Sequence, residues 1–219
     1  TKICGYHHTL ASSEFTAWHS LQSEWSSKFK PDCVISLGSI STKTLRNQGV
    51  PPERIIDGPA LRYNNILVNE SDKIKKNKNN VLIPLSQIKD ASYELVNKIK
   101  ILSKALENTE YIFIIKPHPN LEISKILLSL GLHKLPKNVI ISNEDIDKLL
   151  NTCLFTIFMS TGAAYNAVIN GNVVFNLESE LNFSDNYLDI FEKEFRYVHS
   201  YSLESIQNTL LEFINNNQK

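Results

Sequence analysis

The chain has 219 residues, of which 23 are Lys or Arg and 23 are Asp or Glu. This balance gives no charge excess that would favour nucleic acid or an anionic membrane surface as the main partner. Hydrophobic residues make up 42% of the chain, as in an ordinary globular protein, and an apolar run such as 153–159 is far too short to span a bilayer. The first residue is Thr1 and the only methionine is Met159, so we expect a piece of a longer protein, with no signal peptide.

Short apolar runs alternate with amphipathic segments in the first part of the chain. The pattern predicts strands over residues 2–6, 33–37 and 53–56 and helices over residues 14–29 and 39–48. Residues 69–80 are polar, rich in Lys and Asn and without periodicity, which predicts a linker. We therefore divide the chain into residues 1–68, the linker 69–80 and residues 81–219.

The alternation of strands and helices is clearer after the linker. Strands are predicted over residues 81–85, 111–115, 139–141, 153–158 and 173–175, and helices over residues 88–106, 121–130, 145–150, 161–170 and 202–215. Repeated strand–helix units of this kind imply an α/β domain with a doubly wound parallel sheet and right-handed crossovers. In such a sheet ligands bind beyond the carboxyl ends of the strands, so the residues that follow each strand are the candidates for function.

The three cysteines, Cys4, Cys33 and Cys153, are far apart in the sequence and lie in apolar runs. Their odd number and the lack of a CxxC spacing argue against a disulfide framework and against a zinc site. We expect buried free thiols in a reducing cytoplasm.

A basic pair follows the strand predicted at 111–115. Lys116 and His118 alternate with Pro117 and Pro119, which hold an extended turn at the end of the strand. Lys donates to a phosphate as a point charge, and His donates through a ring N–H. The sequence therefore predicts a phosphate contact here, although the prolines can also simply end a strand.

Small and hydroxylated residues follow the strand predicted at 153–158. Ser160, Thr161 and Gly162 lead into the helix predicted at 161–170. The first turn of a helix offers free N–H groups and the positive end of its dipole, and small residues let a ligand approach the backbone. The segment predicts an anion site, and a plain Ser or Thr helix cap is compatible with it.

Two further strand ends carry polar residues. Glu178 follows the strand predicted at 173–175 and can accept hydrogen bonds from ribose hydroxyls, as acidic residues do in dinucleotide folds. Asn143 follows the strand predicted at 139–141 and either lines a base pocket or caps the helix at Asp145.

In the first part of the chain, His7 and His8 follow the opening strand, where a histidine can act as a general base or contact a sugar. Asp57 and Arg62 lie between the last strand of this part and the linker, where they can border a cleft between domains.

Several common motifs are absent from the sequence. No GxGxxG follows the opening strand, and the chain has no GxxxxGK[ST] and no GxSxG. No DxD-like cluster sits at a strand end to hold a metal–diphosphate, so we expect no metal site, no resident cofactor and a metal-independent reaction.

Taken together, these residues resemble a known family of enzymes. His118-Pro119 with Ser160-Thr161 is similar to the HP and S(S/T) motifs of bacterial sialyltransferases, polysialyltransferases and capsule Kdo transferases, which have the two-domain GT-B fold. The run from Ser160 through Gly171 to Glu178 resembles the nucleotide-sugar signature of that fold, and Gly5-Tyr6-His7-His8 resembles surface-carbohydrate biosynthesis proteins.

The resemblance covers nearly the whole chain and implies a GT-B-like architecture. Residues 1–68 correspond to the end of a smaller, acceptor-side Rossmann-like α/β domain, and residues 81–219 to the nucleotide-sugar-binding domain. In the family the donor is a CMP-activated acidic sugar, and the histidine and hydroxyl motifs contact its phosphate. Asp57-Gly58 matches only part of the acidic base motif of some sialyltransferases.

The resemblance implies transfer of a sugar from a nucleotide donor to a bacterial surface glycan or glycolipid. His118, His7 and His8 would be catalytic, and nucleotide-binding residues would be Lys116, His118, Asn143, Ser160, Thr161, Gly162 and Glu178. We expect a cytoplasmic enzyme, at most peripherally associated with the inner face of the membrane. Three alternatives stay open: CDP-alcohol phosphotransfer, UDP-sugar epimerisation and a non-catalytic nucleotide-binding module that needs a partner.

Overall fold

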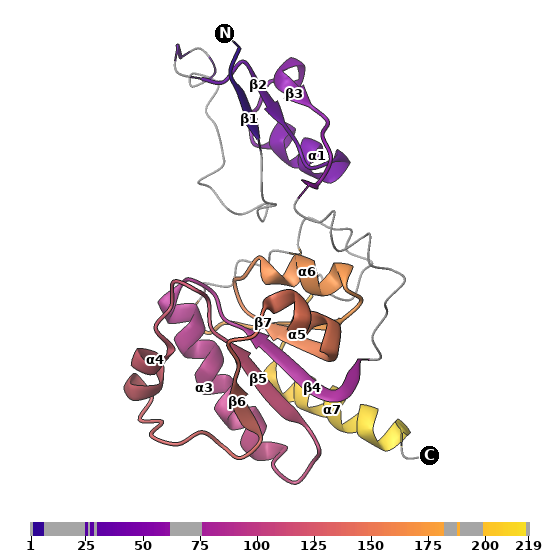
Figure 1. The fold of residues 1–219 in the computed structure, drawn as a ribbon. Helices are drawn as coiled ribbons and strands as arrows, with labels where there is room; N and C mark the ends of the chain where they lie inside the picture. Colours follow the sequence, from indigo (N-terminus) through magenta and orange to yellow (C-terminus); the bar gives the residue numbers. More distant parts are fainter. Residues whose placement is uncertain are drawn as a thin grey trace.

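The computed structural model describes residues 2–6, 25, 27–28, 30–61, 76–181, 188 and 199–217. Its strands form two separate parallel sheets, one of three strands and one of six. Figure 1 shows the small sheet with α1 in one part of the chain and the large sheet with the other helices in the second part.

The small sheet has the order β1-β2-β3, with parallel pairing throughout. Its elements are β1 (Cys4–Tyr6), β2 (Cys33–Ile35), α1 (Ser39–Asn47), the 3-10 turn Pro52–Arg54 and β3 (Ile55–Ile56). The helix predicted over 39–48 and the first two predicted strands are confirmed, while the strand predicted over 53–56 begins only at Ile55, because the 3-10 turn takes up its first half. Most of the helix predicted over 14–29 lies outside the described residues.

The large sheet has the order β6-β5-β4-β7-β8-β9, again with parallel pairing. Its strands are β4 (Asn77–Pro84), β5 (Ile112–Lys116), β6 (Val139–Ile141), β7 (Cys153–Phe158), β8 (Val173–Leu177) and β9 (Ser200–Tyr201). Its helices are α3 (Lys89–Ala105), α4 (Ile123–Ser129), α5 (Ile146–Thr152), α6 (Ala163–Ile169) and α7 (Leu203–Asn217).

Helices cover both faces of the large sheet, which explains why its strands read as uninterrupted apolar runs. Val81 and Ile83 of β4 belong to the core cluster under α3, α4 and α7, whereas Leu82 belongs to the cluster under α5 and α6. Leu95 and Ile99, on the buried face of α3, belong to the first cluster. The doubly wound parallel sheet predicted from the sequence is therefore confirmed.

The linker predicted over 69–80 is wrong at its end. Strand β4 begins at Asn77, and its residues from Asn77 to Asn80 are exposed or half-buried. Asn77 pairs with Cys153 of β7, and Asn80 pairs with Ile112 of β5. The backbone ladder thus extends beyond the apolar run and overrides the low strand propensity of Asn.

Candidate functional site

The large sheet has a topological switch point between β4 and β7. The chain adds β5 and β6 on one side of β4 and then returns to add β7, β8 and β9 on the other. In open α/β sheets, ligands bind in the crevice beyond the strands at such a point. The residues after β5 and β7 flank the end of β4, so the two segments predicted to contact a phosphate lie on either side of the switch.

Two polar segments flank the switch point, and we call them the two arms of the site. Lys116 and His118, at the end of β5, form the first arm. Lys116 is the last residue of β5, and its Nζ donates to the carbonyl of Asn143 at 3.4 Å. The Nδ1 of His118 accepts a hydrogen bond from the N–H of Asn120 at 3.1 Å. A neutral imidazole that accepts at Nδ1 carries its proton on Nε2.

The protonation state of His118 suits a hydrogen-bond donor. Partial burial lowers the pKa of its imidazole below the usual 6.5, because desolvation disfavours the charged ring. The ring is therefore neutral near pH 7 with an Nε2–H to offer, and no described residue accepts from that N–H.

Ser160 and Thr161 form the arm on the β7 side. Ser160 is 1% exposed and has a φ of 47°, and it is the only residue other than Gly with a positive φ in the described ranges. A left-handed backbone costs about 1–2 kcal/mol for an L-residue. Such conformations concentrate at ligand sites, where the surrounding structure holds them in place.

Gly162 leaves space at the start of α6. It is the N-cap of that helix with an ordinary φ of −66°, and the hydroxyl of Thr161 accepts from the N–H of Ala163, the first residue of the helix, at 3.4 Å. A Cβ built on Gly162 would meet nothing within 4 Å. Glycine is therefore required here neither by backbone conformation nor by packing, and its effect is to keep the strand end open.

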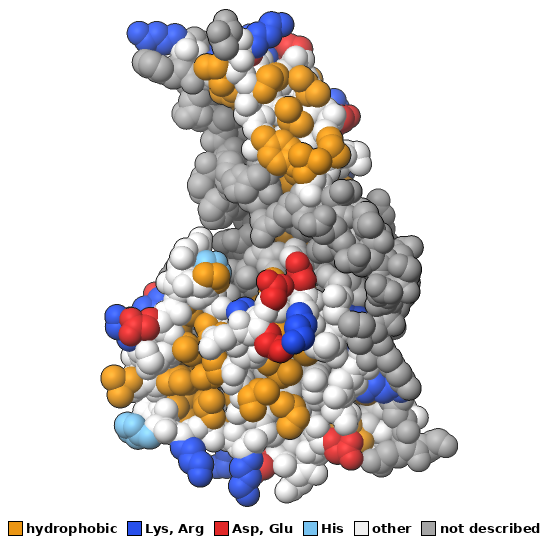
Figure 2. Space-filling view, viewed as in Figure 1, with side chains coloured by type: hydrophobic (Ala, Val, Ile, Leu, Met, Phe, Trp, Pro, Cys, Tyr) orange, Lys and Arg blue, Asp and Glu red, His pale blue; other side chains and the backbone are white. Residues whose placement is uncertain are grey.

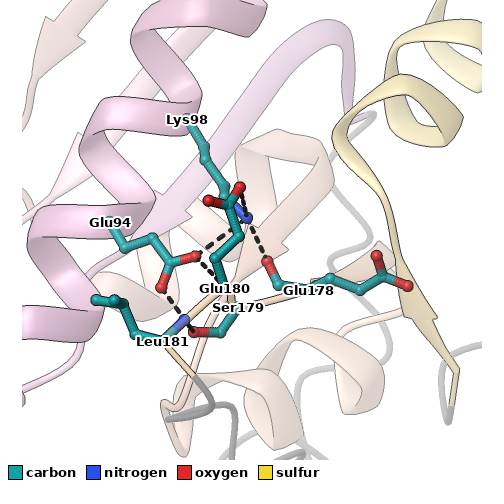
Figure 3. A network of polar contacts seen from close by, with 6 residues as sticks. All are labelled: Glu94, Lys98, Glu178, Ser179, Glu180 and Leu181. Atoms are coloured by element: carbon teal, nitrogen blue, oxygen red, sulfur yellow. Dashed lines mark hydrogen bonds and ion pairs between the residues drawn. The ribbon is translucent and has the colours of Figure 1, made fainter.

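Glu178 lies at the next strand end. Strand β8 continues to Leu177, two residues beyond the prediction, so Glu178 is its first following residue. Its N–H donates to the carbonyl of Tyr201 at 3.0 Å. The side chain is exposed and points away from α3 toward β9 in Figure 3.

A buried carboxylate on α3 holds the loop that begins at Glu178 (Figure 3). Glu94 is 8% exposed, and its two oxygens accept from the hydroxyl of Ser179 at 2.6 Å and from the N–H of Glu180 at 2.7 Å. Lys98 pairs with Glu94 at 3.1 Å and donates to the carbonyl of Glu178 at 2.7 Å. We call Glu94, Lys98 and Ser179 the α3 clamp.

The sequence analysis missed the α3 clamp and also Ser86. Ser86 is 3% exposed and lies two residues beyond the end of β4, beside the switch point, where it accepts from the N–H of Ile88 at 3.1 Å. The rule that function follows strand ends would have found Ser86. Nothing local in the sequence signals that Glu94 contacts Ser179, 85 positions away.

Asn143 does not cap the next helix, which was one of its two predicted roles. Asp145 is the N-cap of α5 and accepts from the N–H of Asp147 at 2.8 Å. The Asn143 side chain is exposed at the end of β6, one strand away from Lys116. Its predicted place in a base pocket stays a prediction.

The small sheet has a polar cluster at its own carboxyl edge. Ser36 follows β2 and Asp57 follows β3, and the hydroxyl of Ser36 donates to Asp57 at 3.3 Å. Thr42 of α1 is within 2.7 Å of the Ser36 hydroxyl and also donates to Asp57. One carboxylate oxygen is thus held by two hydroxyls. The predicted site residues His7 and His8, and Arg62, lie outside the described residues.

Within the described ranges, no helix is both long and apolar enough to cross a membrane. In the same ranges, no three His, Cys, Asp or Glu side chains gather as metal ligands would.

No protein-family description matches this chain, and no curated protein matches it in sequence. Solved structures do match in fold. The UDP-GlcNAc 2-epimerase of Methanocaldococcus jannaschii, solved with UDP-GlcNAc and UDP, is 15% identical with a TM-score of 0.55 over 84% of this chain and 54% of its own. The corresponding epimerase of Rickettsia bellii is 16% identical with a TM-score of 0.53 over 98% and 67%.

A structure solved with sugar ligands matches to a similar degree. TarM of S. aureus, solved as a variant with fondaparinux, α-GlcNAc-glycerol and UDP, is 14% identical with a TM-score of 0.53 over 98% of this chain and 44% of its own. The chain spans about half the length of the first of these structures. At these identities the similarity establishes the fold, which is the α/β, Rossmann-like fold of GT-B proteins.

Proposed function

We propose that this chain is the sugar-nucleotide-binding part of a GT-B glycosyltransferase that acts on a bacterial surface glycan or glycolipid. The observation that carries the proposal is the pair of arms at the switch point. Lys116 and His118 end β5, Ser160 and Thr161 end β7, and the strand between them is β4. We place the enzyme in the cytoplasm, where it meets its acceptor at the inner face of the membrane.

The chemistry proposed for the two arms is stabilisation of a departing phosphate. Negative charge grows on the phosphate oxygens as the sugar leaves, and donors already fixed in place bind that charge more strongly than they bind the ground state. His118 would donate its Nε2–H, Lys116 would supply positive charge, and the hydroxyls of Ser160 and Thr161 would complete the set. Such donors can do this work without a metal ion.

Glu178 is proposed to hold the ribose. Its exposed carboxylate can accept two hydrogen bonds from vicinal hydroxyls. The α3 clamp fixes the backbone of its loop through the carbonyl of Glu178 and the N–H of Glu180. On the acceptor side, Asp57 with one oxygen held by Ser36 and Thr42 is the carboxylate we propose as a base, beside the histidines His7 and His8.

The donor nucleotide is proposed to be CMP-linked, from the resemblance of His118-Pro119 and Ser160-Thr161 to CMP-sugar transferases. UDP is the competing choice, because two of the structures named above, the Methanocaldococcus jannaschii epimerase and TarM, were solved with UDP. A second candidate function, UDP-sugar epimerisation, is favoured by the same observation, since two of those structures are UDP-GlcNAc 2-epimerases.

The proposal is tested by calorimetric titration with CMP, CDP, UMP and UDP. We expect selective binding that His118→Ala and Ser160→Ala each weaken by roughly tenfold, or about 1.4 kcal/mol. His133→Ala and Ser129→Ala are matched controls, because both residues are exposed in and after α4, and they should bind as the unchanged chain does.

The outcomes separate the candidates. Preference for cytidine nucleotides supports a CMP-sugar transferase, and preference for uridine nucleotides overturns that donor. Conversion of a UDP-sugar without an acceptor would establish the epimerase. Binding that survives both substitutions would contradict the phosphate site.

A further inference from the structure

Two of the three cysteines lie side by side on neighbouring strands. Cys4 is the first residue of β1, Cys33 is the first residue of β2, and the two are Cα partners in a parallel pair. Residues in register project to the same face of a sheet. Neighbouring strands lie about 4.8 Å apart, which falls within the range of roughly 4.4–6.8 Å between the Cα atoms of a disulfide.

Contacts beside the two cysteines fix this register. The N–H of Asp32 donates to the carbonyl of Ile3 at 2.7 Å, and the N–H of Ile3 donates to the Asp32 carboxylate, also at 2.7 Å. Arg54 donates to the carbonyl of Asp32 at 2.9 Å. The starts of β1 and β2 are thus tied together without any covalent link, so little reorganisation is needed to join the sulfurs.

The two sulfur atoms are 2.7 Å apart, with Cys4 exposed and Cys33 half-buried. All three thiols are free, as expected, but the expectation that they are buried holds only for Cys153. Burial raises the pKa of Cys153 to about 11, so that thiol is both shielded and unreactive. The chain therefore contains one paired, accessible dithiol and one buried thiol that serves as an internal reference.

We propose that Cys4 and Cys33 are a redox modification site that closes reversibly to a disulfide, with a low-molecular-weight disulfide such as oxidised glutathione as the oxidant. The thiolate of one cysteine attacks the glutathione disulfide, whose S–S bond breaks to release one glutathione. The second thiolate attacks the protein sulfur of the mixed disulfide and releases the other glutathione. The protein loses two electrons and two protons, and the oxidant becomes two molecules of reduced glutathione.

Both cysteines of the pair are in the open, reduced form in this structure. The hydrogen bond with Cys4, followed by burial and by repulsion from neighbouring charge, raises the pKa of the Cys33 thiol, so Cys33 is protonated near neutral pH. The site lies where β1 and β2 begin, at the edge opposite the one that carries Asp57. A disulfide would therefore link β1 to β2 at the start of the small sheet and leave its carboxyl edge unobstructed.

The test is equilibration of the unchanged chain with glutathione mixtures of rising oxidised fraction, followed by acid quenching, alkylation and mass spectrometry. We expect a species lighter by two hydrogen atoms, a Cys4–Cys33 cross-linked peptide, and alkylation of Cys153 only after unfolding. The closed form should melt at a higher temperature, because the link joins residues 29 positions apart and restricts the unfolded chain.

Variants make the result specific. Cys153→Ser should close as the unchanged chain does, while Cys4→Ser and Cys33→Ser should each carry one glutathione on the remaining partner. The proposal is overturned if both cysteines stay open to alkylation at every mixture, if a mixed disulfide accumulates without closure, or if the cross-link involves Cys153. None of these outcomes depends on nucleotide binding.

Discussion

The small and large sheets are built from the same kind of parallel strand, yet they differ in how they are covered. No described strand residue of the small sheet is fully buried, and Ile56 of β3 is 50% exposed. In the large sheet Val81, Leu82 and Ile83 are 0% exposed. Hydrophobic side chains appear on the visible surface of both parts of the chain in Figure 2, so the difference lies in the burial of the strands. The large sheet therefore has fully buried central strands, whereas the strands of the small sheet are only partly covered.

The largest expected effect tests this difference in covering. Phe155 of β7 is 1% exposed, and its ring lies 5.0 Å from that of Phe213 and 6.0 Å from that of Tyr111 between ring centroids. Phe155→Ala should lower the free energy of unfolding by about 3–5 kcal/mol, because it opens a cavity in a filled core. Ile56→Ala should cost about 1 kcal/mol or less. Urea denaturation measures both, and equal losses would mean that the small sheet is as well covered as the large one.

The α3 clamp should give the next largest effect. Glu94→Ala leaves the hydroxyl of Ser179 and the N–H of Glu180 without their acceptor and removes one partner of Lys98, which still donates to the carbonyl of Glu178. The loss should cost about 1–3 kcal/mol of stability. Nucleotide affinity should also fall, because the loop that carries Glu178 is released. Glu144→Ala breaks only an exposed ion pair with Lys148 and should cost about 0.5 kcal/mol or less.

The clamp should also respond to acid. Burial alone would raise the pKa of Glu94, but hydrogen bonds from Ser179 and Glu180 and the charge of Lys98 lower it below its usual value. A depressed carboxyl pKa contributes stability above the pKa of the unfolded chain and loses it as the pH falls through the native value. The stability difference between the unchanged chain and Glu94→Gln should therefore narrow on acidification, and a constant difference would contradict the ionised clamp.

The strain at Ser160 can be isolated by comparing two substitutions. Ser160→Ala and Ser160→Gly both remove the hydroxyl, but only glycine adopts a φ of 47° without steric cost. The glycine variant should be more stable than the alanine variant by about 1 kcal/mol. Thermal unfolding measures the difference, and equal stability would show that the backbone at this position is relaxed.

Two glycines, one beside each sheet, should respond differently to substitution by alanine, because one borders open space and the other is closely packed. A Cβ on Gly162 meets open space, so Gly162→Ala should change stability by about 0.5 kcal/mol or less while weakening nucleotide binding. A Cβ on Gly58 would lie 2.8 Å from the carbonyl oxygen of Ser36 and would also collide with Ile35. In Gly58→Ala the small sheet should therefore unfold at a lower denaturant concentration, while the nucleotide affinity stays unchanged. Loss of affinity in Gly58→Ala alone would reverse these assignments.

The smallest expected effect is in the titration of His118. Its pKa in the free chain should lie below 6.5, because partial burial disfavours the charged ring. Stability from the neutral ring is present above the pKa of the unfolded chain and is lost as the pH falls. A bound phosphate should raise the pKa, which NMR of the imidazole protons would show. The resonances of exposed His133 should not respond to nucleotide. If the pKa of His118 does not change on binding, His118 does not belong to the phosphate site.

The sequence predicted those elements whose signal is local. Uninterrupted apolar runs identify β5 and β7, and the spacing of Leu95, Ile99 and Leu102 identifies α3. Placing Lys116 and Ser160 at strand ends followed from the same runs. The polar start of β4 and the two-residue β9 could not be predicted, because backbone pairing with other strands rather than side-chain character makes them strands.

Contacts between distant segments were equally out of reach. The bond between Glu94 and Ser179 and the register that joins Cys4 to Cys33 depend on the assembled sheets. The positive φ of Ser160 could not be predicted from its residue type, because Ser seldom adopts a left-handed conformation. These are the features in which tertiary structure, rather than periodicity, decides the local arrangement.

The outer strands of the large sheet are short. Strand β6 at one edge has three residues and β9 at the other has two, whereas β4 at the centre has eight. Unpaired backbone groups at a sheet edge are a template for pairing with another chain, and short edge strands limit that template. The large sheet should therefore resist edge-to-edge aggregation even at high protein concentration, and its central strands are shielded by neighbours on both sides.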